Sequence, residues 1–278
     1  MTSQPAILCN GEALVHLPVD DRGAALGDGL FETILVRRGQ CIWLDEHLTR
    51  LAGGCTRLGL DFPRSELERD IAALLGNSPA ADYAVLRISL SRKSAGFRGY
   101  APATGDSNRL LQLAGIPAPN HDHWRSGIRS YLCKTRLPEG AATAGIKHNN
   151  RLAHVMARAE RPVTDFPEGL MLSHNGLVIE GVSSNVFLVV DSTLVTPALD
   201  TAGVVGVVRQ KILAQAQSLG MPQVVRRVEL PELYRAHEMF FCNSLTGIWP
   251  VRALDCLRFS SFELTRKLQS QLEAVWYA

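Results

Sequence analysis

The sequence predicts an α+β protein of two domains, a smaller N-terminal α/β domain and a larger, strand-rich C-terminal domain. Short apolar strands bounded by turn residues alternate with helical patterns along the chain. A proline-rich polar stretch, IPAPNHDHW, interrupts this pattern, and most apolar segments after it have the length of strands. We therefore expect domains at residues 1–115 and 125–278, joined by a linker at 116–124.

Composition is that of an ordinary globular protein. Of the 278 residues, 46% are hydrophobic and 20% are charged, and the net charge of +2 predicts neither a nucleic-acid nor a membrane partner. No apolar run has the length of a membrane span. Six scattered cysteines without a C-x-x-C pair, and an N-terminus unlike a signal peptide, indicate a reducing cytoplasm. His121 and His123 lack a second cluster that would complete a metal site, so no metal is expected.

The N-terminal domain is expected to combine hairpins with two helices. Asn10-Gly11 is a hairpin signal between short strands in residues 6–20, and Arg38-Gly39 marks another hairpin. Asp45 is expected to cap a helix that carries His47 and Arg50 and continues through Leu58. The remaining expected elements are strands at 29–36, 83–91 and 110–116, and a helix from about Pro63 to Leu75.

The C-terminal domain is expected to be mostly strands. Turn residues at Asn175-Gly176, Ser183-Ser184-Asn185 and Asp191-Ser192 divide residues 169–197 into short strands. A glycine-rich turn, TAGVVGVVRQ, opens a helix that runs to about Leu219. The remaining expected elements are strands at 127–134, 224–230 and 238–245, and a helix at 261–276.

The segment AGIKHNNRLAHVMARAE, residues 144–160, is the most informative stretch of the chain. Leu152, Val155 and Met156 recur at helical spacing, so Lys147 precedes or begins a helix. A positive charge is disfavoured near the positive end of a helix. Most lysines are solvated surface residues, but a lysine in this setting is a candidate for chemistry.

Four further features suit an anionic cofactor. Glu180 ends the apolar strand GLVIE, where a carboxylate is commonly just a solvated terminus. The glycines of 203–209 lead into a helix whose first N–H groups can bind phosphate. The turn at 243–247 offers hydroxyl and backbone groups, and Arg50 offers a full positive charge. An amine, a carboxylate and a phosphate cradle together fit pyridoxal 5′-phosphate, although spacing alone does not show that they converge.

Six blocks in order along the chain resemble the fold-type IV pyridoxal-phosphate enzymes. This family includes branched-chain aminotransferases, D-amino acid aminotransferases and aminodeoxychorismate lyases. The blocks are DRGAALGDGLFET at 21–33, EHLTRL at 46–51, GIKHNNRL at 145–152, VIEGVSSNVF at 178–187, GVVGVVR at 203–209 and NSLTGIWPV at 243–251.

The resemblance implies a role for each matching residue. Lys147 would be the Schiff-base lysine, and Glu180 the partner of the pyridine nitrogen. The residues implied to hold the phosphate or lie near the cofactor are Arg50, Asn185, Val207, Val208 and Ser244. The resemblance also implies a homodimer with its active site in a cleft between the two domains.

Within the family, the chain most resembles the aminodeoxychorismate lyases. AGIKHNNRL, FRGYAP and FCNSLTGIWPV carry this resemblance. Arg98-Gly99-Tyr100 has a tyrosine where D-amino acid aminotransferases have the histidine of a carboxylate-binding pair. The resemblance implies conversion of 4-amino-4-deoxychorismate to 4-aminobenzoate and pyruvate for folate biosynthesis, with Thr33, Arg98 and Tyr100 as substrate contacts.

Two alternatives remain at this point. One is a D-amino acid or branched-chain aminotransferase on the same fold, which would require a second half-reaction with a keto acid. The other is a cofactor-free α+β binding protein in which Lys147 and Glu180 are surface charges. Purified protein that stays colourless with added pyridoxal phosphate would favour the second alternative.

Overall fold

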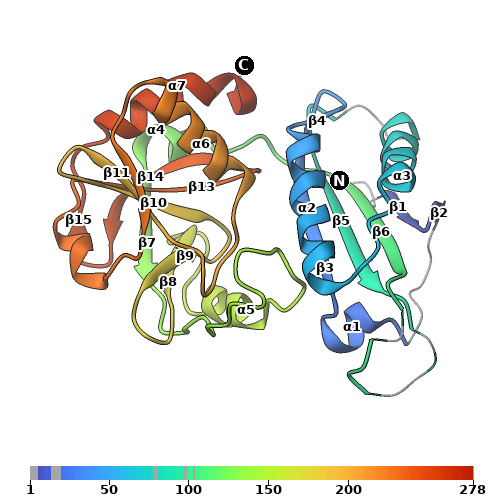
Figure 1. Ribbon diagram of the computed structural model, residues 1–278. Coiled ribbons are helices and arrows are strands. Elements are labelled where there is room, and N and C mark those ends of the chain that lie inside the picture. Colours follow the sequence, from blue (N-terminus) through green and yellow to red (C-terminus); the bar gives the residue numbers. More distant parts are fainter. Residues whose placement is uncertain are drawn as a thin grey trace. The chain divides into compact units, whose positions relative to one another are not determined.

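The computed structural model describes residues 6–13, 20–77, 81–94, 96, 99–102 and 104–277. Contacts divide the chain into two compact units (Figure 1). The first contains Met1–Ala118 and Ile146–Asn150, and the second contains Pro119–Gly145 and Arg151–Ala278. The five residues around Lys147 thus belong to the N-terminal unit, although the expected boundary assigns them to the C-terminal domain.

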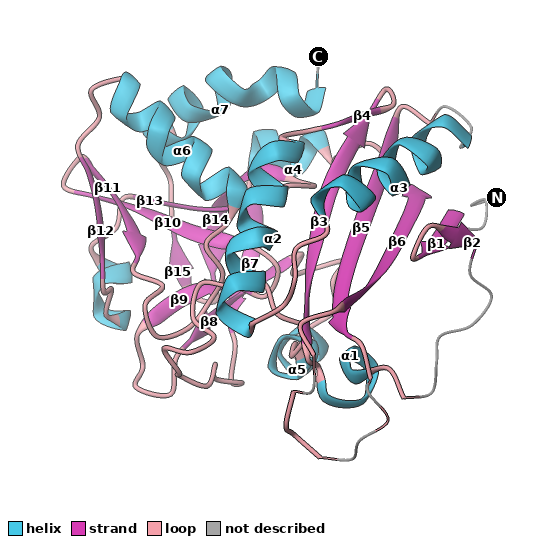
Figure 2. Ribbon diagram, turned by 45° about the vertical axis from the view of Figure 1, so that its right-hand side comes forward, coloured by secondary structure: helices cyan, strands magenta, loops and turns pink. Residues whose placement is uncertain are grey.

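The first unit is an antiparallel sheet with two long helices on one face (Figure 2). The strand order is β2-β1-β6-β5-β3-β4. Its strands are β1 (Ala6–Cys9), β2 (Glu12–Ala13), β3 (Gly29–Arg37), β4 (Gln40–Cys41), β5 (Tyr83–Arg92) and β6 (Ser107–Gly115). Its helices are α1 (Arg22–Leu26), α2 (Leu44–Leu58) and α3 (Arg64–Asn77). The expected hairpin at Asn10-Gly11 is confirmed, and residues 14–19 of the expected strand region lie outside the described residues.

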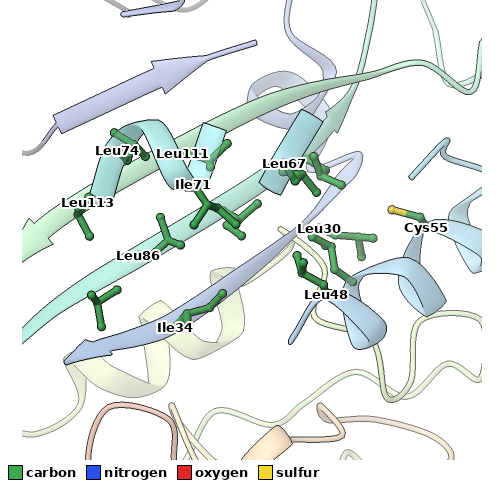
Figure 3. Close-up of a cluster of buried hydrophobic side chains, with 14 of the residues drawn as sticks. Leu30, Ile34, Leu48, Cys55, Leu67, Ile71, Leu74, Leu86, Leu111 and Leu113 are labelled. Carbon is green, nitrogen blue, oxygen red and sulfur yellow. The ribbon is translucent and has the colours of Figure 1, made fainter. Parts of the chain in front are cut away.

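The core of this unit lies between the sheet and the helices α2 and α3 (Figure 3). Alternate residues of β3, including Leu30 and Ile34, face the core together with Leu86 of β5. Leu48 of α2 and Leu67 of α3 cover them, and all five side chains are almost fully buried. Because side chains alternate along a strand, the intervening residues of β3 lie on the other face of the sheet.

The start of α2 differs from the expected cap. Its N-cap residue is Trp43, in a left-handed conformation at φ 52°, and no side chain caps the helix there. Asp45 lies inside the first turn, where a negative charge is favoured by the helix dipole. Its carboxylate accepts a hydrogen bond from Arg64 at 2.5 Å. The prediction of Asp45 as the cap was therefore wrong by two positions.

The second unit is built on a nine-stranded mixed sheet. The strand path is β12-β11-β10-β13-β14-β7-β8-β9, with β15 paired to β14. Its strands are β7 (Ile128–Leu132), β8 (Glu168–Leu172), β9 (Val178–Gly181), β10 (Asn185–Val190), β11 (Thr193–Pro197), β12 (Gln223–Arg226), β13 (Glu238–Asn243), β14 (Gly247–Leu254) and β15 (Leu257–Arg258). Its helices are α4 (His121–Ser126), α5 (Leu152–Ala159), α6 (Val207–Ser218), the short η1 (Leu230–Tyr234) and α7 (Glu263–Tyr277).

Two segments of this unit depart from the expected elements. Helix α4 begins inside the expected linker, because the Asn120 side chain caps it by accepting from the N–H groups of Asp122 and His123. Strand β14 was not expected, and it lies inside the sheet between β13 and β7. Its Pro250 has no N–H to donate to a strand ladder, so the sequence did not indicate a strand there.

Helix α5 confirms the expected helix, and its apolar residues lie on an exposed face. Leu152, Val155 and Met156 are 73%, 63% and 55% exposed within the chain. Ala157 is the buried residue of this helix. In the part of the chain that the structure describes, no helix is long and apolar enough to cross a membrane.

Adjacent glycines in α2 provide a test of the core. A Cβ at Gly53 would meet nothing within 4 Å, whereas one at Gly54 would lie 2.8 Å from Cδ1 of buried Leu30. Gly53→Ala should raise the free energy of unfolding by about 0.5–1 kcal/mol through lower backbone entropy of the unfolded chain. Gly54→Ala should lower it, since overpacking a core costs about 1–3 kcal/mol. Urea unfolding measures both; equal stabilisation by the two substitutions would contradict this packing.

Candidate active site

The segment Ile146–Asn150 pairs with β3 and thereby fixes Lys147. The N–H of Phe31 donates to the Lys147 carbonyl and the N–H of Asn149 to the Gly29 carbonyl, each at 2.9 Å. The Lys147 Nζ lies 4.3 Å from the centre of the Phe31 ring. This is a cation–π distance, so Lys147 is held five residues ahead of α5 with its amine over an aromatic face.

Arg87 lies on the same face of the sheet as Phe31. Its guanidinium carbon is 4.4 Å from the Phe31 ring centre, and Arg87 stands directly opposite Thr33 in the β3–β5 ladder. Among the described residues, none accepts a hydrogen bond from the Arg87 guanidinium or forms an ion pair with it. Burial lowers the pKa of its guanidinium below the usual value. The residue is nevertheless exposed by its accessible surface, so its cation can be reached by an anionic group of a ligand.

Arg50 lies on the opposite, helix-covered face and forms a buried ionic cluster. Its Nε donates to Oε1 of Glu32 at 2.8 Å and its Nη2 to Oε2 at 2.5 Å. His47 Nδ1 lies 2.7 Å from the same Oε2. Burial alone would raise the pKa of Glu32, but the charge of Arg50 and the hydrogen bonds from His47 and Arg50 lower it to about 2. Glu32 therefore holds Arg50 in one orientation as a carboxylate.

In the second unit, Glu180 is anchored at both carboxylate oxygens. Its Oε2 accepts the N–H of Val204 at 2.9 Å, and its Oε1 lies 3.1 Å from Nε2 of His154. The residue is 4% exposed. It is a buried, oriented acceptor at the end of β9, not a solvated strand terminus.

The same turn leads to the uncapped start of α6. The N-cap residue Gly206 makes no side-chain cap bond, and Val207 and Val208 are the first helical residues. Asn185 donates from Nδ2 to the Val204 carbonyl at 2.8 Å, and a Cβ at Gly206 would collide with the Asn185 side chain. The first N–H groups of a helix form an anion site, and here only glycine fits beside the asparagine at its entrance.

The turn after β13 lies next to Asn185. In the β10–β13 ladder Asn185 stands opposite Cys242, and Asn243 Nδ2 donates to the Ser184 hydroxyl at 2.9 Å. The Asn243 side-chain oxygen accepts the N–H groups of the residues at 245 and 246, which shapes the turn around Ser244. The Ser244 carbonyl accepts a hydrogen bond from the indole of Trp276.

The predicted site residues thus gather in two groups. The second unit brings together Glu180, Asn185 and the start of α6, with Ser244 in the neighbouring turn. The first unit brings Thr33 and Lys147 to one face of the sheet and Arg50 to the other. Lys147 follows by two residues Gly145, which belongs to the second unit and pairs with the turn through Gly203 and Val205.

Two predicted substrate contacts are less defined. Tyr100 is 87% exposed, and Arg22 fixes its backbone by donating to the carbonyls of Gly99 and Tyr100 at 3.2 and 3.1 Å. Arg98 lies outside the described residues.

The sequence did not indicate several residues of these groups. Arg87 could have been noticed as a charged residue inside the apolar strand YAVLRISLS. Glu32 stands on the core face of β3, where a carboxylate requires a buried partner. His154 gave no signal, because its contact with Glu180 joins a helix to a strand far along the chain.

The chain matches the Amino-transferase class IV family over residues 29–254. It belongs to this family. The match begins at β3, ends at β14 and includes both Lys147 and Glu180, and it confirms the resemblance drawn from the sequence blocks.

Three class IV relatives are similar over nearly the whole chain. The aminodeoxychorismate lyase of Vibrio harveyi is 35% identical, with 95% of this chain and 98% of the relative covered. The crystal structure of a 4-amino-4-deoxychorismate lyase from Pseudomonas aeruginosa is 43% identical with a TM-score of 0.91, over 96% and 98% of the two chains. A putative branched-chain-amino-acid aminotransferase of Methanocaldococcus jannaschii is 28% identical over 92% and 90%. The expected fold class is confirmed by the solved structure.

The Glu32 cluster predicts a pH dependence of stability. The folded pKa of about 2 lies below the ordinary value of 4.5, so the ionised cluster stabilises the fold above pH 4.5. This contribution, about 3 kcal/mol, is lost as the pH falls from 4.5 towards 2. Glu32→Gln should therefore be less stable than wild type at pH 7 and approach it at low pH, as measured by urea unfolding.

The matched control is Glu12→Gln, an exposed carboxylate in the same unit. This substitution should leave the pH dependence of wild type unchanged. A stability difference between wild type and Glu32→Gln that is constant from pH 7 to pH 3 would show that Glu32 is not held ionised by Arg50 and His47.

Proposed function

We propose that the chain is a pyridoxal-phosphate-dependent lyase that converts 4-amino-4-deoxychorismate to 4-aminobenzoate and pyruvate. One observation carries the proposal: the Glu180 carboxylate and the uncapped start of α6 are joined by the single turn at Val204–Gly206. A ring-nitrogen partner next to a phosphate site suits this cofactor. The lyases of Vibrio harveyi and Pseudomonas aeruginosa support the choice of substrate.

The donor set fits the cofactor at each end. The N–H groups of Val207 and Val208 at the start of α6, with the Ser244 turn and Arg50, would hold the phosphate. Asn185 lies beside this entrance. Glu180 offers an oriented carboxylate for the ring nitrogen, and Lys147 offers the amine for covalent attachment. When bound, the cofactor supplies a protonated ring that accepts electrons from the substrate.

Proton transfer and substrate binding would be carried out by side chains of the chain itself. Lys147 Nζ removes the proton at C4 of the substrate and returns a proton to the methylene carbon of the departing three-carbon fragment. Glu180 keeps the proton on the ring nitrogen. Arg87 binds a substrate carboxylate on the sheet face that carries Thr33, and Thr33, Arg98 and Tyr100 complete the substrate contacts. No second substrate is required, because the amino group leaves with the aromatic product.

A second copy of the chain is proposed as the partner of α5. Leu152, Val155 and Met156 form an exposed apolar face on this helix, and contiguous exposed apolar residues commonly mark a protein interface. With no membrane-spanning helix among the described residues, and with scattered thiols, we propose that this homodimer works in the cytoplasm.

The reaction is tested by following both products from 4-amino-4-deoxychorismate without a keto acid. Pyruvate is measured with a coupled dehydrogenase and 4-aminobenzoate by chromatography. Equal amounts should accumulate over many turnovers, because the cofactor is regenerated in each cycle. Product formation that stops after one turnover, or faster reaction of D-alanine or a branched-chain amino acid with 2-oxoglutarate, would replace the lyase with an aminotransferase.

Variants in the same assay check the residue roles. Lys147→Ala should abolish turnover, and borohydride reduction of the wild type should attach the cofactor to the peptide that contains Lys147.

Arg87→Gln should raise KM by about tenfold to a hundredfold through loss of a charged hydrogen bond. Arg50→Ala should weaken cofactor binding by a similar factor. A label on another lysine, or unchanged constants, would reassign these residues.

The homodimer is tested by light scattering on the purified protein. The wild type should have twice the chain mass of 30.4 kDa, and Val155→Asp should shift it to the monomer by placing a charge on the apolar face. Val225→Asp, at another exposed valine of the same unit, is the matched control and should stay dimeric. A monomeric wild type, or a dimeric Val155→Asp, would contradict the interface.

A further inference from the structure

His154 is a largely buried side chain to which the proposed reaction gives no role. It lies in the first turn of α5, and its side chain is 13% exposed. Its Nε2 is 3.1 Å from Oε1 of Glu180 and 3.2 Å from Nη1 of Arg151. Its Nδ1 is buried and has no hydrogen-bond partner among the described residues. The position of the ring proton must suit all of these neighbours.

A proton on Nδ1 fits poorly. Nε2 could then accept from Nη1 of Arg151 at 3.2 Å, but the buried Nδ1–H would have no acceptor, and the Nε2 lone pair would also face the Oε1 lone pairs of an ionised Glu180 at 3.1 Å. A doubly protonated ring would also bury that unpaired N–H, next to the positive charge of Arg151. In proteins, a buried N–H without an acceptor is rarer than a buried carbonyl acceptor with an unfilled lone pair.

A proton on Nε2 leaves one conflict. Nε2–H then donates to Glu180, and the buried Nδ1 is only an unfilled acceptor. The remaining poor contact is with one N–H of Arg151, whose long side chain carries five such donors and can adjust. The neutral Nε2–H form is therefore favoured by the surroundings of the ring.

We infer that His154 is a positioning residue that stays neutral, carries its proton on Nε2 and donates it to Glu180, which orients that carboxylate for the cofactor ring. This inference rests on the proposed function for the role of Glu180. With His154 on Oε1 and the Val204 N–H on Oε2, the plane of the carboxylate is fixed by two donors from different elements.

The donation also holds Oε1 of Glu180 in place. Without His154 the carboxylate would keep one fixed oxygen, on the Val204 N–H, and could turn away from the position of the cofactor ring. The loss should therefore appear mainly in kcat and in cofactor affinity, and not in KM.

The proton position is measured first, on the apoprotein. Nitrogen-15 spectra of labelled histidine distinguish the two neutral tautomers and the doubly protonated ring, and His154→Gln identifies the signal by its loss. The expected result is a neutral ring with the proton on Nε2. A proton on Nδ1, or a doubly protonated ring at pH 7, would overturn the inference whether or not the protein binds pyridoxal phosphate.

The second measurement is a double-mutant cycle with Glu180. His154→Leu removes the donor and should lower kcat and weaken pyridoxal-phosphate binding, each by about tenfold. His154→Gln places an amide N–H near the position of Nε2 and should remain within about threefold of wild type. In a Glu180→Gln background, His154→Leu should have no further effect on either constant.

The outcomes separate this inference from the proposed function. Equal losses in the Leu and Gln variants, or a full tenfold loss in the Glu180→Gln background, would show that His154 does not act through Glu180. A wild-type protein that does not bind pyridoxal phosphate would reject the proposed function, and the nitrogen-15 result would stand separately. Apoprotein melting temperatures confirm that each variant is folded.

Discussion

The candidate site of the second unit depends on the two backbone groups of Val204. Its N–H holds Glu180 and its carbonyl holds Asn185, while the glycines on either side pair with Gly145 or begin α6. One short turn therefore sets the position of a buried carboxylate, an amide and the first N–H groups of a helix. Because the turn contributes only backbone groups to these bonds, side-chain substitutions within the turn can alter them only by displacing the chain.

In the first unit, successive residues of β3 face opposite sides of the sheet, and different cationic side chains lie on each side. Residue 32 of β3 faces the helices and carries the carboxylate that neutralises Arg50 in the core. Residue 31 faces the other way and presents an aromatic ring to the amine of Lys147 and the guanidinium of Arg87. Arg50 is oriented by a carboxylate of the chain through Nε and Nη2, whereas Arg87 has no carboxylate partner among the described residues and suits a ligand anion.

The sequence predicted elements well where local signals were strong. The hairpin at Asn10-Gly11, the helix after the glycine-rich turn and the strands β5 and β13 all have turn or glycine signals at their ends. It failed where tertiary contacts decide. Pro250 is tolerated inside a sheet, and Trp43 replaces Asp45 as the cap of α2.

For the site, resemblance to the family supplied the residue roles, and the structure supplied their partners. Glu180 and Lys147 were found from short motifs, but His154 and Arg87 stand in no quoted block, and Glu32 stands in the block at 21–33 without a role assigned to it. Each of these acts through a residue far away in the sequence, so no spacing rule could have linked them. Long-range pairing of this kind depends on the fold and is invisible in a single sequence.

The segment Ile146–Asn150 belongs to the first unit but is synthesised after part of the second. This order has a consequence during synthesis on the ribosome. It covers the edge of β3 around Phe31, where the backbone would otherwise offer an unpaired strand edge. Residues up to Ala118 emerge first, so the nascent sheet carries this open edge until residue 150 has been made. At about 5–20 residues per second, the lysine segment arrives a few seconds later. The same five residues that present the amine therefore also protect the newborn sheet from pairing with other chains.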